Sequence, residues 1–219
     1  MNVLVTGAHG FMGRNLVAYL EAVRDGKAPS LAGARLGGRN DDSSLNIFEH
    51  DLDTPPGLLD GYCRDADFVM HLAGVNRPES EGEFMEGNFG FTSALLDALR
   101  KHGNACPVMI ASSTQAALDN PYGRSKKAGE DLLLAYAVET GARALVYRFP
   151  NVFGKWCRPN YNSTVATFCH NVANGLPIVV RDRSHPMTLV YIDDIVAEMV
   201  RARQSGRLRE HKNEERRQL

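Results

Sequence analysis

The sequence has no long hydrophobic run and almost no excess of charge of either sign. No uninterrupted apolar stretch approaches the ~20 residues that a membrane-spanning helix needs. The opening stretch Met1–Gly7 is too short for a signal peptide and lacks its basic residues. With 25 basic and 26 acidic side chains, the formal net charge is −1, which gives no overall field for holding nucleic acid or an anionic membrane. These absences predict a cytoplasmic protein that binds neither nucleic acid nor membrane.

Cysteine is also scarce, and its four copies form neither a CxxC pair nor a zinc-like spacing. Unpaired thiols are typical of reducing compartments, so we expect the cysteines to be free. The scattered histidines show no ligand spacing either, and we expect no bound metal. The cysteines are Cys63, Cys106, Cys157 and Cys169.

What the 219 residues do contain is a repeated alternation of short apolar runs with longer helical patterns. Nearly continuous apolar strands separated by helices indicate a parallel sheet covered on both faces. The predicted fold class is therefore α/β, with a doubly wound parallel sheet. We expect strands at 3–5, 46–49, 68–72, 108–111, 145–147, 178–180 and 189–192, and helices at 14–23, 55–62, 84–100, 122–136, 165–172 and 195–203. The glycine-rich stretch 24–44 is expected to form no long regular element.

A glycine-rich loop links the first expected strand to the first helix. It reads Thr-Gly-Ala-His-Gly-Phe-Met-Gly, and its three glycines have the spacing GxxGxxG. Such a loop permits a tight turn, close approach of a pyrophosphate to the backbone, and close packing of helix on strand. The context predicts a dinucleotide site formed by Gly7, Gly10, Phe11, Met12 and Gly13.

An acidic residue after the second strand commonly accepts hydrogen bonds from the adenosine ribose. Asp51 follows the more apolar candidate strand and is favoured, while Asp41 and Asp42 are alternatives if the strand lies at 34–36. A carboxylate there repels a 2′-phosphate, but Arg35 and Arg39 lie in the same stretch. The choice between NAD and NADP therefore stays open.

A tyrosine and a lysine four residues apart share one helical face, just after a strand that ends in Ser112-Ser113-Thr114. A phenol is a poor acid or base at neutral pH unless a nearby cation favours the phenolate. Lys126 supplies that cation, so Tyr122 is able to exchange a proton with a carbonyl oxygen that a serine hydroxyl holds. The pattern predicts Ser113, Tyr122 and Lys126 as the catalytic group.

Several segments together resemble the extended short-chain dehydrogenase/reductases, the NAD-dependent epimerase/dehydratase family. They are TGAHGFMG, HLAGVN, SSTQA, YGRSK, RFPNVFG and LVYIDDIV. The segments HLAGVNRPE, SSTQAALDNPYGRSK, RFPNVFGKWCRPNYNS and ATFCHN resemble more narrowly the N-terminal reductase half of bifunctional capsular-polysaccharide enzymes. That resemblance implies NAD(P)H-dependent reduction of a nucleotide-linked 4-keto-6-deoxy sugar. There are two alternatives to this reductase function. The chain could be a nucleotide-sugar epimerase that retains NAD, or a non-catalytic homologue that binds a dinucleotide.

The resemblance also implies roles for particular residues. The catalytic trio falls on Ser113, Tyr122 and Lys126, with Thr114 as a second candidate hydroxyl, and Asn88 matches an asparagine that anchors backbone. Cofactor contacts fall on the glycine loop, on Asp51 and on the strand end Leu72, Ala73 and Gly74. Substrate contacts are expected at Asn76, Asn151 and Arg158.

Other expectations concern the substrate loop and the chain's organisation. Trp156 or Tyr161 would stack on a nucleotide or pack within their own loop. Arg77 would meet a substrate phosphate or remain a solvated loop charge, and the solvated charge is favoured. We expect one NAD(P)-binding domain over residues 1–203, with an incomplete substrate lobe at about 151–192. Residues 204–219 are expected to be a charged, disordered tail. The family's helix packing implies a homodimer.

Overall fold

The computed structural model describes residues 1–28, 44–55, 57–180, 182, 184 and 186–204. Its main sheet has five strands, all parallel, in the spatial order β2-β1-β3-β4-β5. The doubly wound parallel sheet predicted from the sequence is therefore confirmed. The strands are β1 (Asn2–Thr6), β2 (Asn46–His50), β3 (Phe68–His71), β4 (Val108–Ser113) and β5 (Ala144–Phe149).

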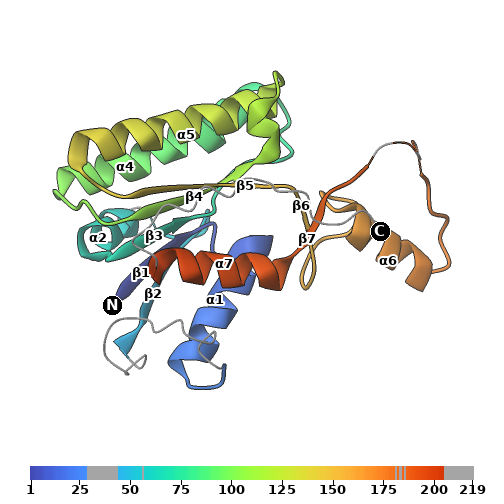
Figure 1. Cartoon of the computed structure of the whole chain (residues 1–219), viewed down its shortest axis with the longest axis horizontal. Helices are drawn as coiled ribbons and strands as arrows, with labels where there is room; N and C mark the ends of the chain where they lie inside the picture. The colour runs from blue at the N-terminus through green and yellow to red at the C-terminus, as the bar shows by residue number, and fades with distance from the viewer. Residues whose placement is uncertain (29–43, 56, 181, 183, 185, 205–219) are drawn as a thin grey trace.

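Helices cover both faces of this sheet, as Figure 1 shows. The face toward α1 and α7 holds one hydrophobic cluster, and the face toward α2, α4 and α5 holds another. The helices are α1 (Phe11–Arg24), α2 (Leu58–Asp65), α3 (Gly82–Phe84), α4 (Phe91–Lys101), α5 (Pro121–Thr140) and α7 (Ile192–Gln204), and a π-helical stretch (Met85–Gly90) precedes α4.

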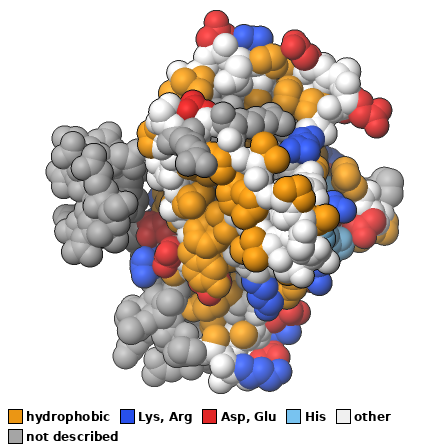
Figure 2. Space-filling view, turned by 90° about the vertical axis from the view of Figure 1, so that its right-hand side faces the viewer, with side chains coloured by type: hydrophobic (Ala, Val, Ile, Leu, Met, Phe, Trp, Pro, Cys, Tyr) orange, Lys and Arg blue, Asp and Glu red, His pale blue; other side chains and the backbone are white. Residues whose placement is uncertain are grey.

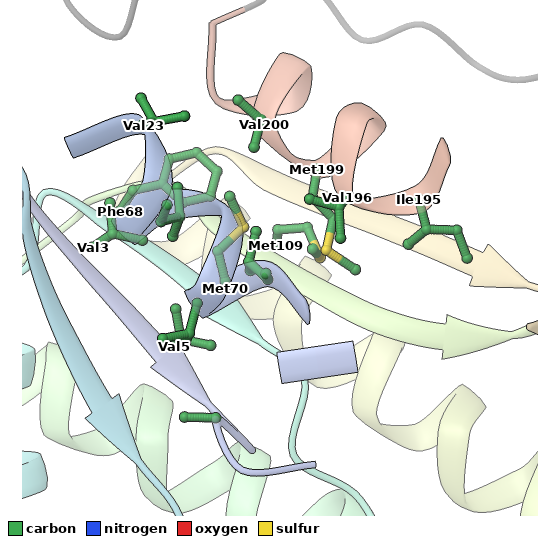
Figure 3. Packing of buried hydrophobic residues seen from close by; sticks show 14 of the residues in the cluster. Val3, Val5, Val23, Phe68, Met70, Met109, Ile195, Val196, Met199 and Val200 are labelled. Atoms are coloured by element: carbon green, nitrogen blue, oxygen red, sulfur yellow. The ribbon is translucent and has the colours of Figure 1, made fainter. Parts of the chain in front are cut away.

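The strand sequences explain this two-sided burial. Successive side chains of a strand point to opposite faces, so Val3 and Val5 join the cluster under α1 and α7 while Leu4 joins the other. Figure 3 shows Met70 and Met109 of the central strands packed against the Met199 side of α7. Burying each of these large apolar side chains contributes about 1.5–3 kcal/mol. The sheet is thereby held rigidly, and the loops at its carboxyl edge have a firm support.

A smaller unit lies beyond the end of β5. It consists of β6 (Asn151–Phe153), α6 (Thr164–Ala173) and β7 (Leu189–Tyr191), and β6 pairs with β7 in parallel. In Figure 1 this unit projects from the sheet at the right, with α6 outermost. No residue of α6 is buried, although half of its residues are apolar.

The strand expected at 178–180 does not form. Ile178, Val179 and Val180 are irregular and exposed, and the two-stranded sheet uses β7 as the partner of β6 instead. The apolar run indicated a strand, but a strand also needs a neighbour for its backbone hydrogen bonds. Figure 2 looks onto this side of the molecule, where apolar side chains form a broad exposed patch.

Some element boundaries also differ from expectation. The helix expected from Pro55 begins at Leu58, after Gly57 with a φ of 96°. The helix expected from Ile195 begins at Ile192, so Asp193 and Asp194 lie in its first turn. Residues 29–43 and 205–219 lie outside the described residues, so the predictions for the glycine-rich stretch and the tail stay predictions. The domain boundary expected at residue 203 also stays a prediction.

Candidate active site

The glycine loop brings the end of β1, the start of α1 and the loop after β3 into close contact. Gly7 has a φ of 70°, and a Cβ there would lie 2.7 Å from the backbone nitrogen of Ala73. A Cβ on Gly13 would lie 2.0 Å from the carbonyl oxygen of Gly7. These two positions therefore exclude any larger residue, which is the packing reason for the spacing seen in the sequence.

The N-terminus of α1 is suited to a phosphate. Its N-cap residue is Gly10, no side chain caps it, and its first turn carries no acidic residue. The backbone N–H groups of the first turn, which includes Phe11 and Met12, thus present the positive end of the helix dipole. This arrangement fits the pyrophosphate of a dinucleotide.

Asp51 lies beside the loop, directly after β2. One of its carboxylate oxygens accepts the backbone N–H of His9 at 2.7 Å, and the other accepts that of Leu52 at 2.8 Å. The His9 ring contacts the carboxylates of Glu49 at 3.7 Å and Asp53 at 3.2 Å. Asp51 is therefore next to the glycine loop, as the ribose role requires. The alternatives Asp41 and Asp42 lie outside the described residues, as do Arg35 and Arg39.

Ser113 and Tyr122 meet at the carboxyl edge of the sheet. Ser113 ends β4, and Tyr122 lies in the first turn of α5, which the Asn120 side chain caps by accepting the N–H of Gly123 at 2.7 Å. Burial raises the pKa of Tyr122, and a hydrogen bond from the Ser113 hydroxyl acts in the opposite direction. The ring of Phe84 lies 5.5 Å from that of Tyr122 and shields one side of it.

Lys126 lies one turn further along α5 and is only 8% exposed. Its ammonium is 5.8 Å from the centre of the Tyr122 ring and donates to the carbonyl oxygen of Ala111 at 3.3 Å. Burial lowers the pKa of Lys126 to about 8, while the nearby Glu130 carboxylate raises it. A Cβ on Gly74 would lie 2.6 Å from the amide oxygen of Asn88 and 2.8 Å from the ammonium nitrogen of Lys126, so a larger residue there would displace these two side-chain ends.

Asn88, in the π-helical stretch, joins this site to the loop after β3. Its amide accepts the N–H of Val75 at 3.0 Å and donates to the Val75 carbonyl at 3.1 Å. It also donates to the hydroxyl of Ser125 at 3.0 Å. The anchoring role that the family resemblance implied for Asn88 matches these contacts.

His71 lies under the site and is fully enclosed by hydroxyl partners. Thr92 donates its proton to the carbonyl of Asn88 at 2.6 Å, so it accepts from Nε2 of His71 at 2.8 Å. Thr6 then donates to Nδ1 at 2.7 Å. Burial, aided by the charge of Lys126, lowers the pKa of His71 to about 3. His71 is therefore a neutral, hydrogen-bonded core residue.

The sequence did not reveal a second buried polar group beside the site. Glu130 accepts a short hydrogen bond from the hydroxyl of Ser112 and two more from the Arg148 guanidinium, at 2.8 and 2.6 Å. These contacts tie α5 to β4 and β5 directly below Ser113 and Lys126. Its one sequence signal was the four-residue spacing of Lys126 and Glu130 on one helical face.

The expected substrate residues lie apart from this compact centre. Asn76 and Asn151 are exposed, and the Asn151 amide donates to the carbonyl of Thr188 at 3.4 Å. Arg158 lies over the ring of Tyr161, 5.7 Å from its centre. Trp156 contacts Arg14 and Lys155 at 4.6 and 3.7 Å, so its ring packs against cations near its own loop.

Arg77 is exposed, as expected of a loop charge, but its guanidinium also has partners in another loop. Its guanidinium donates to the side chain of Asn162 at 3.0 Å and to the carbonyl of Asn160 at 3.2 Å. It also lies over Tyr161, 5.4 Å from the ring centre. The isolated charge in the sequence is thus a connection between two loops that are more than 80 residues apart in the chain.

Within the described residues there is no group of histidine, cysteine, aspartate and glutamate side chains that could hold a metal ion. No helix in the described ranges is long and apolar enough to cross a membrane. A hollow of about 480 Å³ lies beside the glycine loop on the α1 side, between His9, Arg14, Glu49 and Trp156. None of the three predicted catalytic residues lines it.

Taken together, the parallel sheet, the glycine loop at a helix N-terminus and the serine–tyrosine–lysine group define a dinucleotide-binding protein of the short-chain dehydrogenase/reductase type. The sequence profile of the NAD dependent epimerase/dehydratase family matches residues 3–214. The chain belongs to this family, which confirms both the resemblance seen in the sequence and the expected class of cofactor, a nicotinamide dinucleotide.

Two similar proteins come from capsule and nucleotide-sugar chemistry. The chain is 46% identical over 196 residues to UDP-2-acetamido-2,6-beta-L-arabino-hexul-4-ose reductase from Pseudomonas aeruginosa, covering 90% of this chain and 48% of that protein. It is also similar to the crystal structure of the capsular polysaccharide assembling protein CapF from Staphylococcus aureus. The sequence identity is 43% and the TM-score is 0.78, and the match covers 96% of this chain and 52% of that one. The chain thus spans about half the length of each.

A third structure shares the fold at lower identity. It is UDP-glucuronic acid 4-epimerase from Bacillus cereus in complex with NAD, 23% identical, with a TM-score of 0.71 over 94% of this chain and 75% of that one. That likeness concerns the arrangement of strands and helices.

Proposed function

We propose that the chain reduces a nucleotide-linked 4-keto-6-deoxy sugar with NADPH or NADH, in the synthesis of a surface-polysaccharide precursor. The observation that carries this proposal is the placement of Tyr122, in the first turn of α5, near the end of β4 at Ser113, with the buried ammonium of Lys126 5.8 Å from the centre of the tyrosine ring. The reductase from Pseudomonas aeruginosa, whose name gives a UDP-linked hexul-4-ose as its substrate, supports the choice of substrate class.

In the proposed reaction, the residues of this chain donate the proton and stabilise the charge that its transfer leaves behind. The cofactor supplies a hydride to the carbonyl carbon, and the carbonyl oxygen must then gain a proton. Ser113 holds that oxygen, and Tyr122, which is protonated at neutral pH, gives the proton. Burial raises the pKa of Tyr122 and so disfavours the phenolate that this transfer leaves. Lys126 stabilises the phenolate that remains, since its own pKa of about 8 leaves it mostly charged at pH 7.

The remaining residues are assigned to binding. Gly7, Gly10, Phe11, Met12 and Gly13 would hold the pyrophosphate, Asp51 the adenosine ribose, and Leu72, Ala73 and Gly74 would lie along the nicotinamide ribose. Asn76, Asn151 and Arg158 would contact the substrate. Lys126 and Tyr122 would also contact the nicotinamide ribose.

The test is to mix the protein with the UDP-linked 4-keto-6-deoxy-N-acetyl sugar and either NADPH or NADH, and to follow absorbance at 340 nm. Tyr122→Phe should lower turnover by about 10²–10⁴-fold, while cofactor binding, read from energy transfer between Trp156 and the reduced nicotinamide, stays unchanged. Absence of turnover by the unaltered protein with cofactor bound would contradict the proposal.

The alternatives give different results in the same assay. An epimerase would co-purify with NAD and show no net oxidation of added cofactor. A non-catalytic homologue would bind cofactor and ignore the sugar. That alternative is favoured by α6, which has no buried residue.

We further propose a homodimer in the cytoplasm. Leu134 and Val138 share one face of α5 and are 48% and 89% exposed, which offers an apolar surface to a second copy. The cysteines are free thiols, as expected in a reducing compartment. Sedimentation showing only monomer would rule out the dimer.

A further inference from the structure

We infer that Thr6, His71 and Thr92 are positioning residues for the catalytic site. Through one continuous chain of hydrogen bonds they hold the strand-end loop, residues 73–75 after β3, in a fixed place relative to Tyr122. The inference rests on the proposed function, because it concerns the reaction in which Tyr122 gives the proton. It assigns a role to three buried polar residues that the proposed reaction does not use.

The chain of hydrogen bonds begins beside the glycine loop. The backbone N–H of Ala73 donates to the hydroxyl of Thr6 at 3.5 Å, and this hydroxyl donates to Nδ1 of His71 at 2.7 Å. Nε2 of His71 donates to the hydroxyl of Thr92 at 2.8 Å, which in turn donates to the carbonyl oxygen of Asn88 at 2.6 Å. The ends of β1 and β3 are thereby joined to the first turn of α4.

The second half of the chain leads from Asn88 to two sides of the catalytic site. The side-chain oxygen of Asn88 accepts the N–H of Val75 at 3.0 Å, and its amide nitrogen donates to the hydroxyl of Ser125 at 3.0 Å. This hydroxyl donates to the backbone carbonyl of Tyr122 at 2.8 Å. Gly74 also lies against Asn88, because a Cβ there would come within 2.6 Å of its side-chain oxygen. The chain therefore connects the strand-end loop to the backbone of the catalytic tyrosine.

The neutral ring of His71 sets the direction of the bonds. Burial, aided by the charge of Lys126, lowers the pKa of His71 to about 3, so at neutral pH the ring has one N–H and one acceptor nitrogen. Thr92 uses its own proton on the carbonyl of Asn88, so it can only accept from the ring. Nε2 therefore carries the ring proton, and Nδ1 accepts from Thr6.

The stability of the fold does not by itself call for these polar groups in the interior. The side chains of the chain are each at most 4% exposed: Thr6, His71, Asn88, Thr92 and Ser125. Replacing both partners of a buried hydrogen bond by apolar groups of the same shape is often nearly neutral for stability. What the hydrogen bonds add is a fixed distance and direction between neighbours. A catalytic group displaced by about 1 Å can lose about 10²-fold in rate, so that precision serves the reaction.

The test replaces Thr92 by valine, which has the same shape and lacks the hydroxyl. In the assay at 340 nm with saturating NADPH, Thr92→Val should lower kcat by about tenfold or more and change KM for the sugar by less than about twofold. Thr92→Ser, which keeps the hydroxyl, should restore most of kcat. The matched control is Thr140→Val at the other end of α5, because the Thr140 hydroxyl also donates to a carbonyl four residues earlier, that of Tyr136, at 2.8 Å. It should change neither constant.

Two measurements by nuclear magnetic resonance need no sugar. In the unaltered protein the ring of His71 should carry its proton on Nε2. In Thr92→Val the proton should move to Nδ1, because the Thr6 hydroxyl is then the acceptor that remains to the ring. The backbone N–H of Val75 should exchange with solvent about tenfold faster in Thr92→Val than in Thr140→Val.

Three results would overturn the inference. They are equal kcat for Thr92→Val and Thr140→Val in an active protein, a ring proton on Nδ1 of His71 in the unaltered protein, and unchanged exchange at Val75 in Thr92→Val. If the ring proton and the Val75 amide respond as expected but the unaltered protein reduces no sugar, the proposed reduction fails while the positioning of the loop stands.

Discussion

Two buried bases at the carboxyl edge of the sheet have their charge set by different surroundings. Lys126 loses solvent but keeps the Glu130 carboxylate nearby, so its pKa falls only to about 8. His71 loses solvent, faces the positive charge of Lys126 and has only hydroxyl neighbours, so its pKa falls to about 3. At neutral pH the lysine is mostly charged and the histidine is neutral. Only the lysine is therefore suited to stabilise a phenolate.

His71 should make the protein less stable as the pH falls below about 6.5. In the unfolded chain its pKa is near the ordinary value, so the unfolded state binds a proton between pH 6.5 and 3 that the folded state does not. Stability is therefore lost as pH falls through this window, by about 2 kcal/mol between pH 6.5 and 5. We expect urea denaturation at a series of pH values to show this loss.

The matched variant is His71→Asn, which is neutral throughout. The free energy of unfolding of this variant will be lower at pH 7 because one hydroxyl contact is lost. Between pH 6.5 and 5, however, the variant should lose about 2 kcal/mol less stability than the unaltered protein. Parallel curves for the two proteins from pH 7 to pH 5 would show that His71 takes up its proton to the same extent in the folded and the unfolded chain, and would contradict the lowered pKa.

At the residue scale, the sequence predicted contacts that are local or lie at strand ends. Tyr122 and Lys126 share a helical face by spacing, and Ser113 meets them because strand ends share one edge of a parallel sheet. The Arg77 contact with Asn162 was beyond prediction, because it joins two loops whose distance depends on the path of the whole chain. For the same reason Arg148 gave no sign that it would pair with Glu130.

At the scale of elements, hydrophobic pattern predicted the main sheet and failed where an element depends on a partner. The strands of the sheet are buried on both faces, and their apolar runs identify them. The run at 178–180 has the same composition but no neighbouring strand, and it is irregular. The π-helical stretch before α4 also left no sign in the pattern. It places Asn88 where both Val75 and Ser125 can be reached.

Glu130 should stabilise the junction of β4, α5 and β5. Its carboxylate is 4% exposed and the Arg148 side chain 40% exposed, so Glu130→Ala leaves Ser112 unpaired in the interior and Arg148 with water as a substitute partner. We expect a loss of about 2–3 kcal/mol, below the range for a fully buried pair because the arginine is partly hydrated. Urea denaturation at pH 7 measures it.

A double-mutant cycle with Arg148→Met isolates the pair. Since the two side chains contact each other directly, the double variant should lose less stability than the sum of the single ones. Glu130→Gln, which can still accept from Ser112, should lie between the unaltered protein and Glu130→Ala. Strictly additive losses would mean that the two residues act on the fold separately.

At the scale of the whole molecule, the helices that cover the main sheet and the helix of the α6 unit differ in how many of their side chains are buried. Helices α4 and α5 contain the fully buried side chains of Leu95, Leu96, Leu99 and Leu133, whereas α6 contains no fully buried side chain. A helix of 10 residues such as α6 draws most of its stability from packing against the rest of the protein. The α6 unit should therefore open locally at a much lower free energy than the sheet does.

Hydrogen exchange followed by mass spectrometry tests this difference. Amides of Thr164–Ala173 should exchange by local opening and be insensitive to mild urea, while those of α4 and α5 should approach the free energy of global unfolding. UDP should slow exchange in the loop that carries Arg158 and Tyr161 and in α6, because a ligand held at the start of this unit stabilises the conformation that binds it. Peptides of α2, far from that loop, serve as the internal control and should be unaffected by UDP. Protection of α6 equal to that of α4 without any ligand would show that the outer unit is as firmly held as the sheet.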